Sequence, residues 1–520
     1  MGKIQVNQGG KQKMNLKKQE GITLTILVVT IVVILLIVGA SIGTILSRQG
    51  LLKSAQEAQQ VQQNQAQKEE QKTNDLIDSV GSSGSGISAI NLDESVNSPK
   101  LKEGMIPVKW QDGSWVVTDS SDENWYNYRE KQWANVMLTD GLTVEGIMDV
   151  TTATMQEMKG KRVTNVGSMF VWIPRYAYKI TQNYHKGGDS ITGNIEVCFL
   201  KDATNNPIKE GQIVVEYNAG TTKNYTTFPD GYVVHPAFQY EQSITGLWVA
   251  KFEASHTGCT ASENTGSTDT NVTTKTLQVK PGVTSWRNIQ IGTSYSVCLN
   301  YQPTLNSHLM KNTEWGAVAY LSQSTCGKGS KIWVNNSGSY ITGATGNTAV
   351  ASQNTGVDTN YTSQQGVQAS SNGNVTGIYD MAGGAWEYTA SYLKNGYVKE
   401  PGTDGAISNN NKYTYGDVLI KGANKAKFNY AVASTDDATN NYGANKEKYG
   451  DAIYEVSSNS ISNWDDSWNA EFSQFPSTET PFMIRGGAYD NASLAGTYAF
   501  KGSSGEAATN CGFRPVLVVL

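Results

Sequence analysis

Cysteine and histidine, the residues that most often hold metals or act as nucleophiles and bases, are scarce in this chain. No two of the five cysteines have the close spacing of a metal clip, and the four histidines show no zinc-peptidase spacing. Neither a GxSxG serine motif nor a phosphate-binding Walker motif is present. His256 and Cys259 are three positions apart, which we interpret as a surface pair rather than as two metal ligands. The sequence therefore offers no recognisable catalytic constellation of these kinds.

The cysteines are also too few to form a dense disulfide framework. Their number is odd, so at least one thiol is unpaired unless it bonds another chain. Sparse cysteines in a surface protein indicate a core stabilised by burial, although one disulfide remains open without a preferred pair. The candidates are Cys198, Cys259, Cys298, Cys326 and Cys511.

Charge is low as well, with 17% charged residues against a usual share of about 25%. The net charge of -5 gives no basic footprint, which argues against a nucleic-acid partner. The 52 glycines, together with many Asn, Ser and Thr residues, favour short strands joined by tight turns. Twelve tryptophans and 26 tyrosines can bury large apolar areas, so the chain is expected to fold.

Residues 22–46 form an uninterrupted apolar run, long enough as a helix to cross a hydrocarbon core of about 30 Å. A secretory signal peptide is the rival interpretation, but its apolar core usually spans only about 7–15 residues. The basic residues precede the run, so the positive-inside rule leaves the N-terminus in the cytoplasm and the rest outside. The basic residues are Lys3, Lys11, Lys13, Lys17 and Lys18, opposed only by Glu20.

The junction KKQEGITLTILVV resembles the leader of type IV prepilins, in which a peptidase cuts after a glycine. The matching cut would fall between Gly21 and Ile22, which makes 1–21 a leader. Pilins that polymerise usually carry Glu at the fifth mature position, where this chain has Ile26. The resemblance thus leaves open a minor pilin-like subunit, a pilus-associated protein or a plain membrane anchor.

Beyond the membrane we expect three connecting segments before the main domain. Residues 47–80 are rich in helix-forming Gln, Ala, Glu and Lys, which predicts a polar helical stalk. The sequence GSSGSG at 81–86 is typical of a flexible linker. Residues 87–159 contain the strand-like fragments MIPVKW, SWVVT and WANVML, which predict a β-rich lead-in packed on the domain 160–520.

Residues 160–520 resemble the sulfatase-modifying-factor family, best known for the formylglycine-generating enzyme. The resemblance rests on ordered segments, among them GIYDMAGGAWEYTAS (377–391), RGGAYDN (485–491) and CGFRPVLVVL (511–520). It implies an α+β variant of the C-type lectin fold, with many short strands and loops and a few helices. Strands are then expected within 167–178 and 246–255, and a helix within 307–324.

The motif residues suggest a structural role. Arg514 lies in the apolar run 513–520, and a buried Arg needs a partner, for which the bidentate-capable carboxylate of Glu387 is the candidate. Structural calcium is a further option that the resemblance raises at Glu387, although Gly384 replaces the family's usual Asn. We interpret the following motif residues as structural: Trp386, Glu387, Arg485, Gly486, Gly487, Gly512, Phe513 and Arg514.

The oxidase chemistry of the named enzyme is not expected to carry over. That enzyme uses copper held by two cysteines after the Arg-Gly-Gly signature, and residues 485–510 contain no cysteine. We therefore expect a non-enzymatic surface binder or adhesin without a cofactor. The alternative is a formylglycine-generating-type oxidase or another enzyme that modifies surface proteins.

The last loops, 488–510, carry the Tyr, Asn, Asp, Ser and Gly residues typical of adaptable binding surfaces. Related proteins include the variable targets of diversity-generating retroelements, which mutate this stretch. The partner is then an extracellular protein or glycan, besides the membrane and other pilin-like subunits. Inward packing of Tyr498 beside Phe500 is the alternative to ligand contact. The predicted contact residues are Tyr489, Asp490, Asn491, Ser493, Thr497, Tyr498, Phe500 and Lys501.

Overall fold

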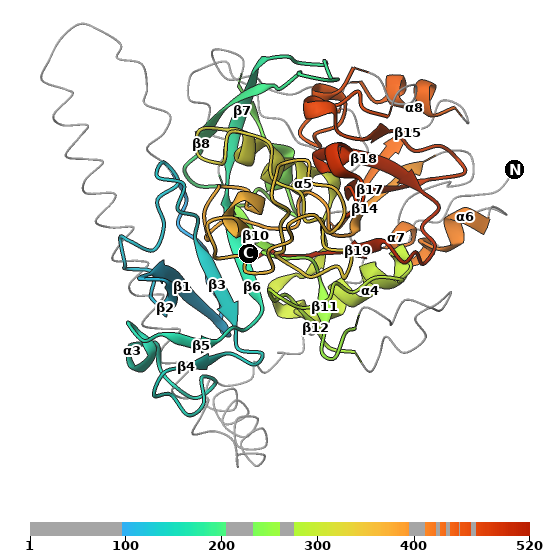
Figure 1. Ribbon diagram of the computed structural model, residues 1–520. Coiled ribbons are helices and arrows are strands. Elements are labelled where there is room, and N and C mark those ends of the chain that lie inside the picture. Colours follow the sequence, from blue (N-terminus) through green and yellow to red (C-terminus); the bar gives the residue numbers. More distant parts are fainter. Residues whose placement is uncertain are drawn as a thin grey trace, which may run out of the picture.

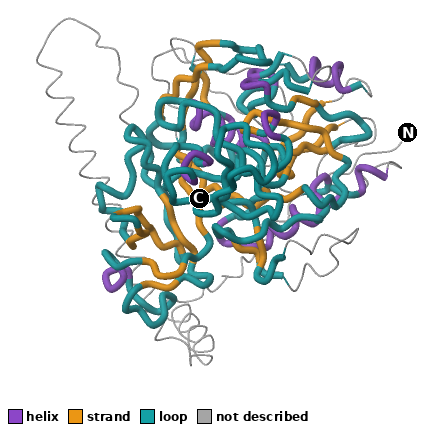
Figure 2. The backbone as a smooth tube through the Cα atoms, viewed as in Figure 1, coloured by secondary structure: helices purple, strands orange, loops and turns teal. Residues whose placement is uncertain are grey.

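The computed structural model describes a mixed α+β fold made mostly of short strands and loops, as the sequence predicts (Figures 1 and 2). It describes residues 96–203, 232–260, 275–394, 411–422, 427–432, 437–446, 448–458 and 464–520. Within these ranges, no helix has the length and apolar character needed to cross a membrane. The predicted leader, cleavage site, apolar helix, stalk and linker all lie outside the described residues, and so do residues 87–95 of the lead-in.

A seven-stranded antiparallel sheet runs through the centre of the protein (Figure 1). Its strands come both from the predicted lead-in and from the residues after 160. The lead-in strand β3 pairs directly with β6 and so continues the sheet. In spatial order the strands are β13 (His308–Leu309), β20 (Pro515–Leu517), β10 (Gly246–Ala250), β6 (Met169–Pro174), β3 (Asn135–Leu138), β1 (Met105–Gln111) and β2 (Ser114–Val117).

A second sheet of six strands carries the C-terminal motifs. Its central strand, β14 (Trp386–Lys394), pairs antiparallel with β17 (Phe482–Gly486) and parallel with β19 (Cys511–Phe513). The remaining strands are β15 (Asn429–Val432), β18 (Gly496–Ser503) and β16 (Ser473–Gln474). In Figure 1 this sheet lies to the right of the seven-stranded sheet. The run 513–520, expected to form one closing strand, is instead shared between the two sheets.

Three small sheets and several helices complete the described fold. The sheets are β8 (Asn194–Phe199) with β7 (Tyr176–Gln182) and β9 (Val233–Val234), β4 (Thr143–Val144) with β5 (Val163–Asn165), and β11 (Ser255–His256) with β12 (Leu277–Gln278). The α-helices are α3 (Met155–Met158), α4 (Ile291–Tyr301), α5 (Asn312–Gln323), α6 (Asn411–Thr414), α7 (Asp417–Ile420) and α8 (Ala438–Ala444). The 3-10 turns are η2 (Pro236–Phe238), η4 (Pro303–Leu305), η5 (Gly366–Ala369), η7 (Tyr454–Val456), η8 (Trp468–Ala470) and η9 (Ala492–Leu494).

Helix α5 is the buried centre of the fold, which explains its all-round lack of charge beyond the first turn. The Glu314 side chain accepts a hydrogen bond from the Lys311 backbone N–H at 2.8 Å and so caps the helix start. All twelve residues of α5 are buried, as expected for a helix enclosed by other elements. The helix therefore brings both sheets into one core.

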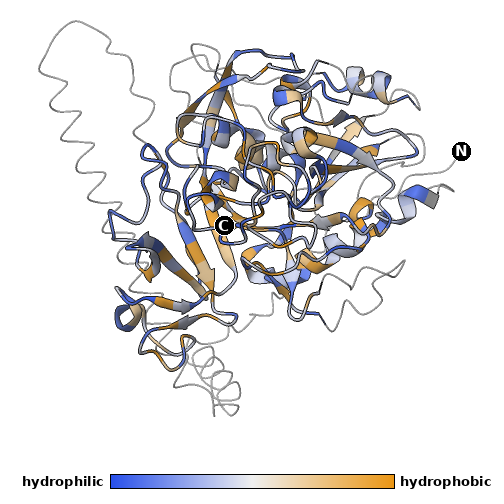
Figure 3. Ribbon diagram, viewed as in Figure 1, coloured by the Kyte–Doolittle hydropathy of each residue, from blue (hydrophilic) through white to orange (hydrophobic). Residues whose placement is uncertain are grey.

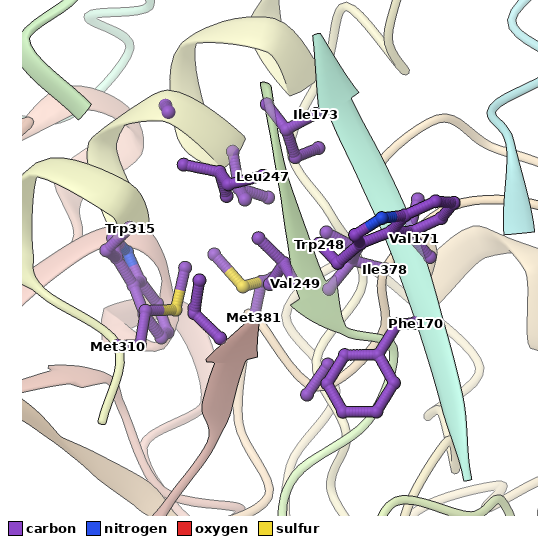
Figure 4. Packing of buried hydrophobic residues seen from close by; sticks show 14 of the residues in the cluster. Phe170, Val171, Ile173, Leu247, Trp248, Val249, Met310, Trp315, Ile378 and Met381 are labelled. Atoms are coloured by element: carbon purple, nitrogen blue, oxygen red, sulfur yellow. The ribbon is translucent and has the colours of Figure 1, made fainter. Parts of the chain in front are cut away.

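One hydrophobic cluster extends from the lead-in strands to the C-terminus. Figure 4 shows Trp315 of α5 and Met310 facing Leu247 and Val249 of β10. The central strands are correspondingly hydrophobic in Figure 3, while polar residues mark the outer loops. Because this core is shared, the loops between the sheets rest on a continuous, closely packed support.

Candidate ligand-binding face

Glu387 and Arg514 form the buried ion pair that the sequence predicts. Arg514 Nε donates to Glu387 Oε2 at 2.7 Å, and Arg514 Nη2 donates to Oε1 at 2.5 Å. Burial alone would lower the pKa of Arg514, but the facing carboxylate more than offsets this and raises it. Arg514 also donates to the carbonyls of Ala250 and Tyr379. The pair therefore links the two sheets beneath the C-terminal loops.

Gly384, at the position where the predicted resemblance would place an Asn, leaves no space for a side chain. A Cβ there would lie 2.3 Å from Glu253 Oε1, and the backbone has φ +72°. Burial raises the pKa values of both Glu253 and Glu387, and Glu387 already uses both oxygens for Arg514. No group of three or more His, Cys, Asp or Glu in the described ranges is placed to hold a metal ion. The geometry gives the predicted calcium no additional support.

Arg485, Gly486 and Gly487 turn the chain out of β17 into the last loops. The fully buried Arg485 donates to the carbonyls of Ala499, Asp451 and Ala452. Gly486 and Gly487 have φ values of +89° and +81°, a region that favours glycine. These contacts are structural, as the sequence predicts for this motif.

The loop Gly487–Ala495 is fastened at several points along its backbone. Tyr489 N donates to the Gly384 carbonyl at 2.8 Å, and Lys331 Nζ donates to the Ser493 carbonyl at 2.7 Å. The Asn491 side chain also holds the start of the loop, because its Oδ1 accepts a hydrogen bond from Ala488 N at 2.8 Å. The predicted contact residue Asn491 thus has a clear loop-shaping role, and the loop presents its other side chains from a fixed backbone.

Among the predicted contact residues of this loop, Asp490 and Ser493 are exposed, and Tyr489 and Asn491 are partly exposed. Tyr489 packs edge to face on Tyr340, with ring centroids 4.7 Å apart. Behind Tyr340, the Arg287 guanidinium lies 3.5 Å from the ring centroid. We name these five residues, Arg287, Tyr340, Tyr489, Asp490 and Ser493, the Tyr489 face.

Two features of the Tyr489 face are unusual for purely structural residues. Tyr340 has φ +53°, a left-handed conformation that is costly for a bulky side chain and concentrates at functional sites. Arg287 Nη2 is buried and has no hydrogen-bond partner among the described residues.

Three predicted contact residues belong instead to the core, which corrects that part of the prediction. Thr497, Tyr498 and Phe500 are 5%, 1% and 0% exposed in β18. Tyr498 N donates to Glu471 Oε2 at 2.6 Å, and Trp315 Nε1 donates to the Thr497 carbonyl at 2.7 Å. The reason is that the side chains of β18 pack into the core: Tyr498 belongs to the main hydrophobic cluster and packs on Trp468, and Phe500 belongs to a second buried cluster. The inward alternative for Tyr498 is therefore confirmed.

Lys501 is partly exposed but is not part of the Tyr489 face as defined. Its ammonium lies 5.5 Å from the centre of the Phe472 ring. Phe472 in turn contacts the rings of Trp386 and Trp464. The predicted contact residues thus fall into three groups: those of the loop Gly487–Ala495, Lys501 beside Phe472, and the buried residues of β18.

Arg287 and Tyr340 were not identified from the sequence. They come from loops far from residue 488 in the chain, and neither belongs to a motif with recognisable spacing. Only the structure places them under Tyr489. All five cysteines lie within the described residues and none forms a disulfide, so the disulfide that the sequence left open is not present; Cys259 is partly exposed and the other four are buried.

No protein-family model matches the chain, and no curated protein matches it either. The resemblance to the sulfatase-modifying-factor family and the lectin-like fold accordingly remain predictions.

Proposed function

We propose that this chain is a non-enzymatic cell-surface binding protein, an adhesin in the broad sense, whose ligand contacts the Tyr489 face. The supporting observation is that Arg287, Tyr340 and Tyr489 stack on one another. Tyr489 is presented by a loop whose backbone is held by hydrogen bonds. Tyr and Arg dominate the energetically important positions of protein interfaces. A rigid support lowers the entropic cost of presenting them.

The ligand in this proposal is an extracellular protein or glycan that carries a hydrogen-bond acceptor. Arg287 is 5% exposed and lies behind Tyr340, so it would support the Tyr340 ring, and the exposed Ser493 hydroxyl would donate to the ligand's acceptor. The exposed Asp490 carboxylate and Ser493 would contact the ligand's polar rim. Tyr489 would supply most of the apolar contact area.

Anchoring at a membrane, with the described domain outside the cell, completes the proposal. Its support is the apolar run 22–46 and the basic residues that precede it. Association with a pilus and cleavage after Gly21 are further parts of the same proposal. So is diversification of the C-terminal loops by a retroelement, for which exposed positions such as Asp490 are suitable because they can vary without disturbing the core.

The proposal is tested with the full-length chain purified in a mild detergent and applied to arrays of extracellular proteins and oligosaccharides. The Tyr489→Ala variant should lose binding by about tenfold or more, since buried aromatic anchors often contribute about 2 kcal/mol. Met148→Ala is the matched control, because Met148 is fully exposed in the loop after β4. Equal binding by the folded Tyr489→Ala variant would contradict the proposal.

A further inference from the structure

A cavity of about 380 Å³ lies beside the first two strands of the fold. The hairpin of β1 and β2, the turn after β2 and the segment between α3 and β5 contribute its walls (Figure 1, lower left). This volume falls within the usual range of small-molecule sites, about 300–1,000 Å³. Most of its lining side chains are polar, among them Lys109, Asp112, Ser114, Asp122, Lys159 and Arg162.

Backbone pairing covers the outer edge of β2 next to this cavity. Val117 N donates to the Lys161 carbonyl at 2.9 Å, and Gly160 N donates to the Val117 carbonyl at 2.8 Å. Val116 and Arg162 form a further antiparallel bridge. An extended peptide commonly binds by adding a strand to a free sheet edge, so this pairing disfavours a peptide as the ligand. The same pairing fixes the backbone from which Arg162 reaches the cavity.

Two of the three cations that line the cavity are already paired with carboxylates. Lys109 Nζ lies 2.8 Å from Asp122 Oδ2, which also accepts a hydrogen bond from Thr118 Oγ1 at 2.6 Å. Burial raises the pKa of Asp122, but the hydrogen bonds from Lys109 and Thr118 outweigh this effect and lower it to about 2. Lys159 Nζ lies 2.5 Å from Asp119 Oδ2. Each of these two pairs is therefore neutral overall.

The guanidinium of Arg162 is the lining cation that remains available to a ligand. Arg162 is exposed, and its Nη2 donates to Ser114 Oγ at 2.8 Å. A guanidinium carries five N–H donors in a planar fork that matches a carboxylate. Because Arg162 lines the cavity, the donors that no described residue uses are accessible to a ligand inside it.

Asp112 also lines the cavity and limits the negative charge that a ligand can carry. Its carboxylate is exposed and accepts a hydrogen bond from Gln111 Nε2 at 3.4 Å. A doubly charged phosphate would be repelled by this carboxylate. A single carboxylate on a hydroxyl-rich body can instead pair with Arg162, while its hydroxyls donate to Asp112.

We propose that this cavity binds a saccharide that carries a carboxylate, such as a sialic or a uronic acid. Arg162 would hold the carboxylate through parallel hydrogen bonds, and Asp112 and Gln111 would bind the sugar hydroxyls. Val116 and Val117, which also line the cavity, would contact the apolar face of the ring. The cavity shares no lining residue with the Tyr489 face and so goes beyond the function proposed above.

The test compares acidic and neutral saccharides on the full-length chain, purified in a mild detergent. Sialyllactose and a hyaluronan oligosaccharide carry a sialic and a uronic carboxylate, and lactose is the neutral counterpart of sialyllactose. The wild type should bind at least one of the two acidic saccharides tenfold or more tighter than lactose. The one that binds more tightly identifies the source of the carboxylate.

Arg162→Gln removes the charged fork at an exposed position and should weaken binding of the acidic saccharide by about tenfold or more. Arg129→Gln is the matched control, because it makes the same change at an exposed arginine that does not line the cavity. This control should leave the affinity unchanged. Thermal melts establish that each variant is folded.

Four results would overturn the inference. They are equal binding of lactose and the acidic saccharides, binding of a sugar phosphate as tightly as of the acidic saccharides, full affinity of a folded Arg162→Gln variant, and loss of the binding in Tyr489→Ala but not in Arg162→Gln. Should Arg162→Gln fail to fold, Arg162→Lys replaces it, since it keeps the charge but loses the planar fork, and it must also weaken binding.

Discussion

Arg514 joins the two sheets of the fold by donating two hydrogen bonds to Glu387, one residue after β19 ends and one before β20 begins. Both side chains are essentially inaccessible to solvent. A buried charge that loses its partner costs far more than the intact pair contributes, because the remaining charge stays desolvated. This asymmetry gives the first prediction.

Replacing Arg514 by Met should lower the free energy of unfolding by about 3–5 kcal/mol, because Glu387 is then buried without its cation. Urea unfolding of the purified protein measures this loss. The double variant Arg514→Met with Glu387→Leu should recover part of the loss, since neither charge remains. A double variant no more stable than the single one would show that the pair does not act as a unit.

Adding a side chain at position 384 should destabilise the fold. In Gly384→Ala the new Cβ meets Glu253 Oε1, and the left-handed backbone at φ +72° adds strain. We expect a loss of about 1–3 kcal/mol in thermal or urea unfolding. Gly443→Ala is the matched control, because nothing lies within 4 Å of a Cβ there. Equal stability of the two variants would contradict the described backbone.

The two tyrosines of the predicted contact set should behave differently on truncation. Tyr498→Ala removes a buried ring packed on Trp468 and should cost about 3–5 kcal/mol. Tyr489→Ala should cost much less, about 1 kcal/mol, because its ring is partly exposed and contacts chiefly Tyr340. Comparable losses in melting temperature for the two variants would show that Tyr489 is also a core residue.

Glu455 should make stability depend on pH. Burial raises its pKa to about 7, while the Tyr178 and Tyr320 hydroxyls and Gly450 N donate to it and oppose that rise. Between the ordinary value of 4.5 and about 7, the folded carboxyl keeps a proton that the unfolded chain has lost. This contribution is therefore complete below pH 4.5 and is lost as pH rises through 7.

Glu455→Gln should remove that contribution, because an amide does not titrate. From pH 5 to pH 8 the wild type should lose on the order of 3 kcal/mol more than the variant in urea unfolding. His235, whose pKa burial lowers to about 3, changes stability in the opposite direction, but it is present in both proteins and cancels in the difference. Parallel pH profiles would refute the role assigned to Glu455.

The sequence predicted those strands, the helix and the ion pair that follow from a short stretch of sequence or from a single buried charge. Arg514 in an apolar run required a partner, and Glu387 had the matching chemistry. The apolar fragments 105–110, 114–118 and 133–138 correspond to β1, β2 and β3, and the expected helix is α5. These features depend on the pattern of neighbouring residues or on one strong energetic requirement.

The binding surfaces could not be derived in the same way. The mixed polar and aromatic order of Thr497, Tyr498 and Phe500 suits an exposed loop as well as a strand enclosed on both faces. Arg287 and Tyr340 reach Tyr489 only through tertiary packing, across about two hundred and one hundred and fifty residues of sequence. Such contacts follow from the path of loops, which local patterns do not specify.

The most direct test of the proposed function is the binding of a triple variant, Tyr489→Ala, Asp490→Ala and Ser493→Ala, to the ligand array. The three positions share one exposed loop, whose backbone contacts they leave intact. The account predicts that the wild type binds at least one extracellular protein or oligosaccharide, and that the folded triple variant loses this binding by tenfold or more, about 1.4 kcal/mol. Retention of full affinity by a triple variant with an unchanged melting temperature would contradict it.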